Sequence, residues 1–289
     1  MIELATRRDP RQWRTILFVP ADRPEMLAKA QRRGADAILI DLEDAIPTRA
    51  KAHARRVARE QLEDGALTGP SAVCVRINAV GEGGVTDLRA LAGLHIDAVV
   101  VPKAVDASAL ARVREELDDA LADGEDAALI PQVESARGIV QLAELVSATR
   151  LAAIALGGED LCVDLGVSRS ADSLELLVPR ALVSLHAHAL GLAAIDTVYT
   201  AIDDELGLVR ETMVARQLGF SGKLLIHPAQ IEPVRQVFAP SQADVDWARR
   251  VLAGDDEQEV PRAGVRVVDG RMVDAPVIAQ AQRILRRAQ

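Results

Sequence analysis

The feature that most constrains this chain is the regular alternation of short apolar runs with longer helical patterns. The runs are rich in branched aliphatic residues and apolar at consecutive positions, which is typical of strands buried on both faces. There are eight runs, at residues 15–20, 37–41, 72–78, 98–102, 128–134, 151–157, 192–198 and 223–228. Because a helical pattern follows each of them, we expect parallel strands joined by right-handed crossovers.

Eight strand–helix units predict an α/β fold, a closed (β/α)8 barrel of the TIM type. A doubly wound open sheet is the alternative. The clearest helical patterns lie at residues 24–33, 49–63, 107–122, 136–147, 174–189 and 205–218. Gly34, Gly191 and Gly219 follow helical runs, where a left-handed C-cap is expected.

The last part of the chain lies outside the eight units. We expect residues 1–240 to form the barrel, which is the catalytic domain, and residues 241–289 to form a C-terminal helical extension. The pattern predicts a helix at 242–253, a hairpin at 264–273 and a final helix from Pro276. Since the barrel does not need this segment, we expect a lid that caps the barrel or reaches a neighbouring subunit.

Composition excludes several classes of protein. No apolar stretch approaches the roughly 18 residues of a membrane span, and the first residues lack the apolar region of a signal peptide. Two cysteines cannot form a disulfide scaffold. With 43 acidic against 34 basic residues, the net charge of −9 disfavours nucleic-acid binding. We therefore expect a cytoplasmic enzyme or binding protein with neither a membrane nor a nucleic acid as partner.

Aromatic residues make up only 2% of the chain, so the core must consist of aliphatic side chains. Trp13 and Trp247 lie outside the strand ends, and there is a single tyrosine. We therefore expect no aromatic stacking platform at the mouth of the barrel, and substrate recognition through a metal, an arginine, backbone N–H groups and aliphatic walls.

Active sites of such barrels lie at the carboxyl ends of the strands. The strand ends bring the following polar side chains to one mouth: Asp41, Glu43, Asp44, Arg76, Asn78, Lys103, Glu134, Glu159, Asp160, Asp196 and His227. Crowded carboxylates repel one another and are costly to desolvate, and a divalent cation would resolve both problems. Oxygen ligands with few histidines favour Mg²⁺, with Mn²⁺ as the alternative, over Zn²⁺.

Glu134 and Asp160 are the best candidates for metal ligands, because they end adjacent strands. The alternative is that each caps the following helix or pairs with Arg76. Gly157 and Gly158 beside them let the backbone approach a ligand and expose N–H groups to an oxyanion.

Arg76 and Lys103 can likewise have either a functional or a structural role. Arg76 can clamp a substrate carboxylate through its planar fork, or form a salt bridge to Glu43 or Asp44. Lys103 can form a Schiff base or, as the metal signal favours, act as a charge partner in an acidic mouth. His227 either contacts substrate or is structural.

Several motifs occur together and in a fixed order. They are RTILFVPADRPEM, ADAILIDLEDAI, VRIN, VVPK, PQVESARG, GGEDLCVDLG, AIDTVY, LGFSGKLLIHPAQI and VDAPVIAQAQRIL. With these motifs the chain, over residues 14–285, resembles the citrate lyase β-subunit-like family of citryl-CoA, malyl-CoA and citramalyl-CoA lyases and malyl-CoA thioesterases. Ala21 departs from the pattern, since many members have glycine there.

The resemblance implies an Mg²⁺-dependent carbon–carbon lyase that acts on acyl-CoA thioesters. It implies that Glu134 and Asp160 bind the metal and that Arg76 is a catalytic residue binding the carboxylate of the 2-oxo or 2-hydroxy acid portion. Gly158 and the neighbouring backbone match oxyanion contacts to the same portion.

The resemblance also assigns residues farther from the metal. Asp41, Asp44 and Lys51 lie in a stretch that borders the CoA site. Asp274 matches a catalytic aspartate on a lid delivered by a neighbouring subunit, which implies a homotrimer or homohexamer. The alternative for Asp274 is an N-cap of the last helix, since Ala275 and Pro276 follow it.

Three functions remain open. The first is a stand-alone lyase that cleaves malyl-CoA, citramalyl-CoA or a similar thioester to acetyl-CoA and a 2-oxo acid, or catalyses the reverse condensation. The second is the β-subunit of a citrate lyase complex, whose thioester is carried by an acyl carrier protein. The third is a malyl-CoA thioesterase. A non-catalytic binding module is disfavoured by the intact set of Glu134, Asp160 and Arg76.

Overall fold

A computed structural model describes residues 9–64, 67, 69–120, 126–253 and 266–288. The chain folds as two compact units, Met1–Arg235 and Gln236–Gln289. The first unit contains the eight-stranded barrel, and the second contains two helices and a short hairpin.

The eight strands of the first unit form a closed barrel in which each strand pairs in parallel with the next and β8 pairs with β1. The strands are β1 (Thr15–Pro20), β2 (Ala37–Asp41), β3 (Ala72–Arg76), β4 (Ala98–Val101), β5 (Ala128–Val133), β6 (Ala153–Leu156), β7 (Ala193–Asp196) and β8 (Gly222–Leu225). The predicted TIM barrel is therefore confirmed, and the doubly wound alternative is wrong. All eight predicted runs contain a strand, although most strands end before their run does.

Small residues fill the interior of the barrel. Alternate positions on the strands point inward, and many of these are alanine. The buried interior cluster contains Trp13, Ile16, Ala37, Leu39, Ala72, Cys74, Ala98, Val100, Ile130, Ala153, Ala155, Ala193, Ile195 and Leu224. This packing explains the low aromatic content, because a narrow barrel filled by layers of small and branched side chains has little room for rings.

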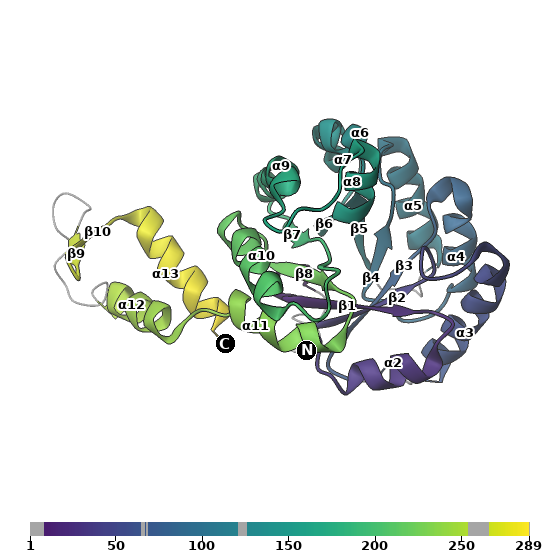
Figure 1. Cartoon of the computed structure of the whole chain (residues 1–289), viewed down its shortest axis with the longest axis horizontal. Coiled ribbons are helices and arrows are strands. Elements are labelled where there is room, and N and C mark those ends of the chain that lie inside the picture. The colour runs from purple at the N-terminus through teal and green to yellow at the C-terminus, as the bar shows by residue number, and fades with distance from the viewer. Residues whose placement is uncertain (1–8, 65–66, 68, 121–125, 254–265, 289) are drawn as a thin grey trace. The chain divides into compact units, whose positions relative to one another are not determined.

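Helices surround the barrel (Figure 1). They are α2 (Pro24–Gln31), α3 (Lys51–Glu63), α4 (Gly84–Ala90), α5 (Ala107–Ala120), α6 (Ala136–Val140), α7 (Leu142–Ser147), α8 (Gly158–Leu165), α9 (Leu177–Ala189), α10 (Glu205–Gln217) and α11 (Ile231–Phe238). The helix predicted at 136–147 is broken at Gln141, and α8 was missing from the prediction. Gly34, Gly191 and Gly219 have φ angles of +73°, +68° and +98°, which confirms the expected left-handed conformation.

Asp196 does not lie at the mouth, contrary to expectation. Its carboxylate is fully buried and accepts hydrogen bonds from Arg180 Nε (2.8 Å) and Lys223 Nζ (2.6 Å), and Lys223 also bonds Glu211. Burial opposes ionisation, but Lys223 and Arg180 outweigh it and lower the pKa of Asp196 to about 2. The residue therefore belongs to a structural ion network of β7, β8, α9 and α10.

The second unit is built on two amphipathic helices. α12 (Gln242–Ala253) packs against α13 (Ala275–Arg287) through Ala248, Val251 and Ala281, and the hairpin of β9 (Arg266–Val268) and β10 (Arg271–Val273) adds Val273 to this core. The predicted helix at 242–253, the hairpin and the last helix are confirmed. None of the helices in the described parts of the chain is long and apolar enough to cross a membrane.

Candidate active site

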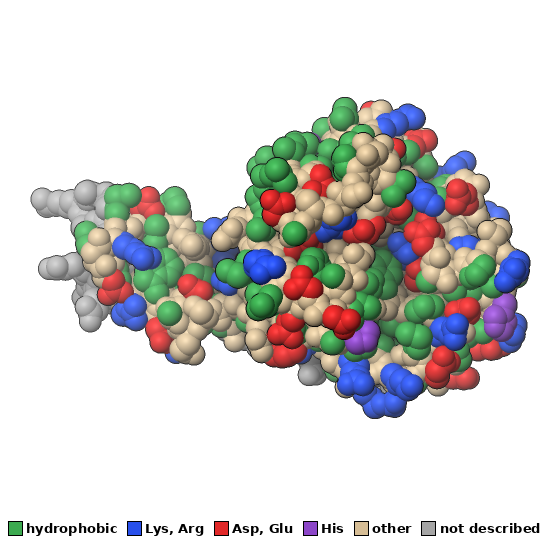
Figure 2. All heavy atoms as spheres, viewed as in Figure 1, with side chains coloured by type: hydrophobic (Ala, Val, Ile, Leu, Met, Phe, Trp, Pro, Cys, Tyr) green, Lys and Arg blue, Asp and Glu red, His purple; other side chains and the backbone are tan. Residues whose placement is uncertain are grey.

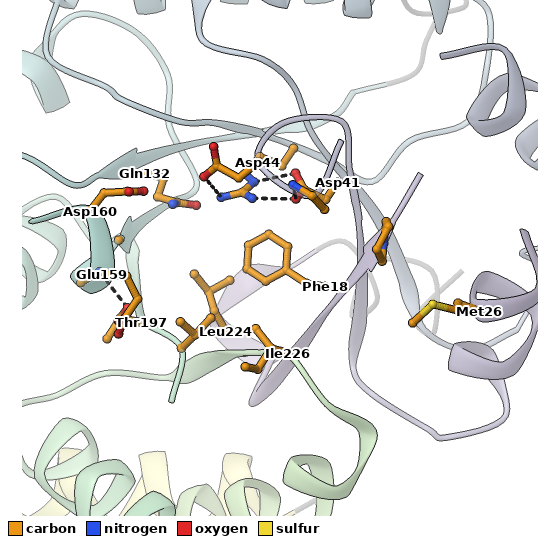
Figure 3. A pocket seen from close by; sticks show the side chains of 16 residues that line it. Phe18, Met26, Asp41, Asp44, Gln132, Glu159, Asp160, Thr197, Leu224 and Ile226 are labelled. Atoms are coloured by element: carbon orange, nitrogen blue, oxygen red, sulfur yellow. Dashed lines mark hydrogen bonds and ion pairs between the residues drawn. The ribbon is translucent and has the colours of Figure 1, made fainter. Parts of the chain in front are cut away.

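A pocket of about 490 Å³ opens at the carboxyl ends of the barrel strands. One side is polar and the other is apolar: Figure 3 shows Asp41, Asp44, Gln132 and Asp160 along one edge and Phe18, Leu224 and Ile226 along the other. These residues come from the strands, from the loops that follow them and, for Asp160, from the first turn of α8, as the barrel rule predicts.

Arg76, the last residue of β3, is held rigidly in this pocket. Its Nε and Nη2 donate to the two carboxylate oxygens of Asp41, at 2.8 and 2.7 Å. Nη1 lies 3.1 Å from Glu43 Oε2 and 3.9 Å from Asp44. Burial alone would lower the pKa of Arg76, but Asp41, Glu43 and Asp44 raise it, so the guanidinium stays charged.

The face of the guanidinium rests on an aromatic ring. The Arg76 Cζ lies 4.5 Å from the centroid of the Phe18 ring, a cation–π contact. The expectation of no aromatic surface at the mouth is therefore wrong for this ring. It lies inward on β1 because Ile16 and Phe18 are two residues apart, and that spacing could have predicted it.

Glu134 directly follows β5 and is only 3% exposed. Its Oε1 accepts the backbone N–H of Lys103 (2.6 Å), whose left-handed backbone (φ +51°) aims that group at the site. Its Oε2 accepts from Gln132 Nε2. Burial, then the charges of Glu43 and Asp160, raise the pKa of Glu134 to about 7.

Asp160 lies in the first turn of α8 and lines the pocket. The turn between β6 and α8 approaches Glu134 closely, since a Cβ on Gly157 would lie 2.3 Å from Glu134 Oε2. Glycine is therefore required at position 157 for the turn to pass Glu134 this closely, and the pairing of Glu134 with Asp160 at one metal stays a prediction.

The side-chain oxygen atoms of Glu134, Asp160 and Gln132 are suitable ligands for a hard divalent cation. The negative charges of Glu134 and Asp160 repel each other when no cation lies near them. In addition, Gln132 Oε1 is a buried acceptor without a hydrogen-bond partner. Within the described residues no cluster of three or more His, Cys, Asp and Glu side chains could hold a metal. Two protein carboxylates with remaining positions for substrate and water suit Mg²⁺, which keeps several such ligands.

The Gly158 N–H was expected to be exposed to a bound oxyanion, but it faces other residues of the protein. Its N–H donates to Thr197 Oγ1 at 2.8 Å, and a Cβ would meet Leu176 and Thr197 within 3 Å. The Leu161 N–H donates to the Gly157 carbonyl at 3.2 Å, and the first turn of α8 carries the positive end of the helix dipole. An oxyanion contact at Gly158 or its neighbours stays a prediction.

The two lysines near the site have structural partners. Lys103 Nζ lies 3.0 Å from Glu43 Oε1, which agrees with its interpretation as a charge partner. Lys51 Nζ donates to the carbonyls of Leu42 (2.8 Å) and Glu43, and so fixes the loop after β2. Of the three residues expected near CoA, Asp41 holds Arg76, Lys51 holds this loop, and Asp44 is exposed at the pocket edge.

Two further predicted residues cap helical turns. His227 caps the 3₁₀ turn at Pro228–Gln230 by accepting the Ala229 N–H, so it is structural. Asp274, in the second unit, is the N-cap of α13 and accepts the N–H of Val277 at 3.2 Å. Asp274 is therefore a helix cap in this structure, and its catalytic role stays a prediction.

Gln132 and Thr197 were missed by sequence reasoning. Gln132 lies two residues before Glu134, so strand alternation turns both side chains toward the interior. This spacing was a usable signal. No sequence signal pointed to Thr197, which follows β7, because its role depends on its hydrogen bond with the Gly158 N–H in the folded protein.

Comparison with known proteins agrees with this site. A model of the HpcH/HpaI aldolase/citrate lyase family matches residues 14–228. The chain is 37% identical over 285 residues to the citrate lyase subunit beta of Leuconostoc mesenteroides subsp. cremoris, covering 95% of this chain and 93% of that protein. It is 38% identical over 278 residues to the (3S)-malyl-CoA thioesterase of Cereibacter sphaeroides, covering 96% and 95%.

Solved structures show the same relationship. The protein CitE from Mycobacterium tuberculosis, in complex with magnesium, acetoacetate and coenzyme A, superposes with a TM-score of 0.79 at 36% identity, covering 96% of this chain and 99% of that one. RipC from Yersinia pestis superposes with a TM-score of 0.69 at 32% identity, covering 82% and 100%. These matches confirm the resemblance inferred from the motifs, and the chain belongs to the HpcH/HpaI aldolase/citrate lyase family.

Proposed function

We propose that this protein is an Mg²⁺-dependent carbon–carbon lyase that cleaves a 3-hydroxyacyl-CoA thioester to acetyl-CoA and a 2-oxo acid, or catalyses the reverse condensation. The observation that carries the proposal is one pocket with two functional halves. A rigid, permanently charged Arg76 faces it from β3, and the carboxylate of Asp160 lines it from α8. The buried carboxylate of Glu134, after β5, lies close enough to Asp160 for that charge to raise its pKa.

Arg76 binds the carboxylate next to the hydroxyl-bearing carbon. A guanidinium has five N–H donors, and Asp41 accepts two of them. Nη1 forms an ion pair with Glu43 at 3.1 Å, so N–H donors remain for a substrate carboxylate. Because Asp41 fixes the fork before substrate arrives, little side-chain entropy is lost on binding. Glu134 and Asp160 would hold the metal, and when bound it supplies Lewis-acid polarisation of the substrate oxygens.

The reaction balances without an added oxidant or reductant. In cleavage the hydroxyl proton passes to solvent, the hydroxyl carbon becomes the carbonyl of the 2-oxo acid, and the adjacent carbon–carbon bond breaks. Its electron pair remains on the thioester as an enolate, which takes up a proton to give acetyl-CoA. The N–H groups that follow Gly158 in the first turn of α8, at the positive end of that helix, would contact the 2-oxo acid portion, since the Gly158 N–H itself donates to Thr197 Oγ1.

The proton donor to the enolate is Asp274, delivered by the lid of residues 241–289 from a neighbouring subunit. Asp41, Asp44 and Lys51 border the CoA entrance, with Asp44 the exposed member. CitE, whose structure contains coenzyme A and magnesium, supports a thioester substrate. A cytoplasmic location agrees with such a substrate and stays a prediction.

The homotrimer or homohexamer that this arrangement requires is supported by an apolar surface. Hydrophobic side chains gather over α6, α8 and α9 (Figure 2). Val140, Val163, Val178 and Leu185 are 84%, 79%, 66% and 67% exposed in the single chain. Exposed apolar side chains gathered in this way are found at protein interfaces.

The test is incubation of purified protein and Mg²⁺ with a small panel of acyl-CoA thioesters, following free CoA, acetyl-CoA and the 2-oxo acid separately. Equal amounts of acetyl-CoA and 2-oxo acid are expected. Release of free CoA with the hydroxy acid would instead establish a thioesterase, which the Cereibacter relative makes the second candidate. Activity only on a carrier-protein thioester would indicate a citrate lyase subunit.

Variants test the metal half of the site. Asp160→Asn is expected to abolish Mg²⁺ binding and turnover, and Glu134→Ala likewise. Glu159→Gln is the matched control, because Glu159 lies beside Asp160 in the same helical turn but pairs with Arg169. Normal metal affinity in Asp160→Asn would contradict the assignment.

A further inference from the structure

The position of the Asp160 carboxylate depends on the first turn of α8, from which it projects (Figure 3). In the described parts of the chain this carboxylate forms no hydrogen bond or ion pair with another residue. The turn begins with two glycines and has no side-chain cap, so its backbone is weakly restrained. It is held by the Gly157 N–H, which donates to the last residue of β5 at 2.9 Å, and by the Gly158 N–H, which donates to Thr197. Both bonds precede Asp160 in the chain.

One side chain ties this turn to the rest of the barrel. Gly166 ends α8 in a left-handed conformation (φ +70°), and the chain that follows returns alongside the helix. Arg169 on this returning segment donates from Nη1 to Glu159, the neighbour of Asp160, and from Nη2 to Glu211 on α10. The guanidinium therefore joins the turn that carries Asp160 to a helix of the barrel wall.

The far end of this connection is firmly anchored. Glu211 is 6% exposed, accepts a hydrogen bond from Lys223 Nζ at 2.8 Å and lies 3.1 Å from Arg180 Nη2. The same two cations bond the buried Asp196. Two buried acids are thus balanced by two buried cations without Arg169, so the core network does not need its charge.

A serine with an uncommon backbone conformation orients Arg169. Ser173 is buried and has a φ angle of +52°, which is rare for a residue other than glycine and persists only where the surroundings impose it. Its hydroxyl accepts from Arg169 Nη2 at 3.0 Å and donates to Glu211. Glu175 lies 3.4 Å from Arg169 Nε on the other side. The guanidinium is therefore fixed from several directions.

We propose that Arg169 is a positioning residue for the metal half of the site. By holding Glu159 against Glu211 it fixes the first turn of α8, and with it the carboxylate of Asp160. Arg169 does not line the pocket, so it acts through that turn and not on the substrate. The proposal rests on the proposed function, in which Asp160 is a metal ligand.

The test measures Mg²⁺ affinity by calorimetry in substrate-free protein. Arg169→Met is expected to weaken Mg²⁺ binding about 10- to 100-fold, the usual effect of removing a group that orients a metal ligand. Arg169→Lys should recover part of the affinity, because an ammonium keeps the charge but cannot bridge two carboxylates as the fork does. At saturating Mg²⁺ the kcat of Arg169→Met should return to that of the wild type. Unchanged Mg²⁺ affinity, or a kcat that stays low at saturating Mg²⁺, overturns the proposal.

Variants of Glu159 separate contact from charge. Glu159→Gln keeps an oxygen that accepts from Arg169 and should keep the Mg²⁺ affinity, whereas Glu159→Ala removes the contact and should match Arg169→Met. Because both variants break one connection, the double variant should bind Mg²⁺ no more weakly than either single variant. Additive losses would mean that the two residues act separately, which contradicts the proposal.

Two further variants complete the design. Arg114→Met removes a buried arginine of α5 that bonds the carbonyl of Ala127 and pairs with Asp118, away from the pocket. It should lower thermal stability and leave Mg²⁺ affinity unchanged, and an equal loss of affinity there would reduce the Arg169 effect to general loosening and overturn the proposal. Normal affinity in Asp160→Asn overturns the metal site of the proposed function itself. Loss in Asp160→Asn with normal affinity in Arg169→Met overturns only the role of Arg169.

Discussion

The guanidinium of Arg76 and the carboxylate of Asp41 form two parallel hydrogen bonds, at 2.8 and 2.7 Å, across the paired ends of β3 and β2. Asp41 Oδ1 and Oδ2 also accept the N–H groups of Glu43 and Ala45, so one carboxylate fixes both the arginine and the loop after β2. The position of the carboxylate-binding fork is thus set by the fold rather than by the substrate.

The first prediction concerns this pair. Asp41→Asn keeps one acceptor but loses the charge and half of the fork, so Arg76 becomes mobile. A hydrogen bond to a charged group contributes about 1.5–3 kcal/mol, so kcat/KM is expected to fall about 10- to 100-fold, mostly through KM. Arg76→Lys should have at least as large an effect, because an ammonium cannot reproduce the planar fork.

The matched control is Asp118→Asn, which removes one charge from an exposed carboxylate on α5 that also pairs with an arginine. Steady-state kinetics and thermal unfolding of all three variants provide the measurement. If Asp41→Asn changed kcat and left KM unaltered, Arg76 would act on the transition state alone rather than bind the carboxylate.

The second prediction concerns the close approach of Gly157 to Glu134. A methyl group at Gly157 would lie 2.3 Å from Glu134 Oε2 and 2.5 Å from its Cβ, so Gly157→Ala must displace Glu134. Mg²⁺ affinity, measured by calorimetry, is expected to fall as far as in Glu134→Ala. Gly81→Ala is the control, because no atom lies within 4 Å of the added methyl group and φ is not positive there. Unchanged Mg²⁺ affinity in Gly157→Ala would show that Glu134 is not a ligand.

The third prediction is a dependence of stability on pH in metal-free protein. Burial and neighbouring charges raise the pKa of Glu134 from 4.5 to about 7. A carboxyl with a raised folded-state pKa contributes stability that is fully present below pH 4.5 and lost as the pH rises through 7, here about 3 kcal/mol.

Urea unfolding in EDTA between pH 4.5 and 8 tests this. The free energy of unfolding of the wild type should decline relative to that of Glu134→Gln, which cannot ionise, and Mg²⁺ should restore the wild type above pH 7. Parallel pH profiles for the two proteins would mean that Glu134 ionises normally.

The sequence predicted the barrel because buried parallel strands have a distinctive apolar pattern, and the barrel rule then placed Arg76, Glu134 and Asp160 at one mouth. It could not predict which charges pair there. Asp196 faces the helix layer rather than the mouth because it is the last residue of β7, one position after the inward-facing Ile195. Phe18 and Gln132 were missed, although the same alternation could have predicted both, whereas the contact of Gly158 with Thr197 depends on tertiary packing.

The last prediction separates the two roles of Asp274. Its side chain caps α13 by accepting the Val277 N–H, so a loss of activity in Asp274→Ala could reflect a loosened helix. Asparagine is as good an N-cap as aspartate but cannot act as a general acid or base. Asp274→Asn is therefore expected to keep the thermal stability and Mg²⁺ affinity of the wild type while kcat falls at least about 100-fold. Asp244→Asn, an acid in the first turn of α12, is the control and should keep full kcat. Full kcat in Asp274→Asn would leave Asp274 as a helix cap and assign the proton transfer to another group.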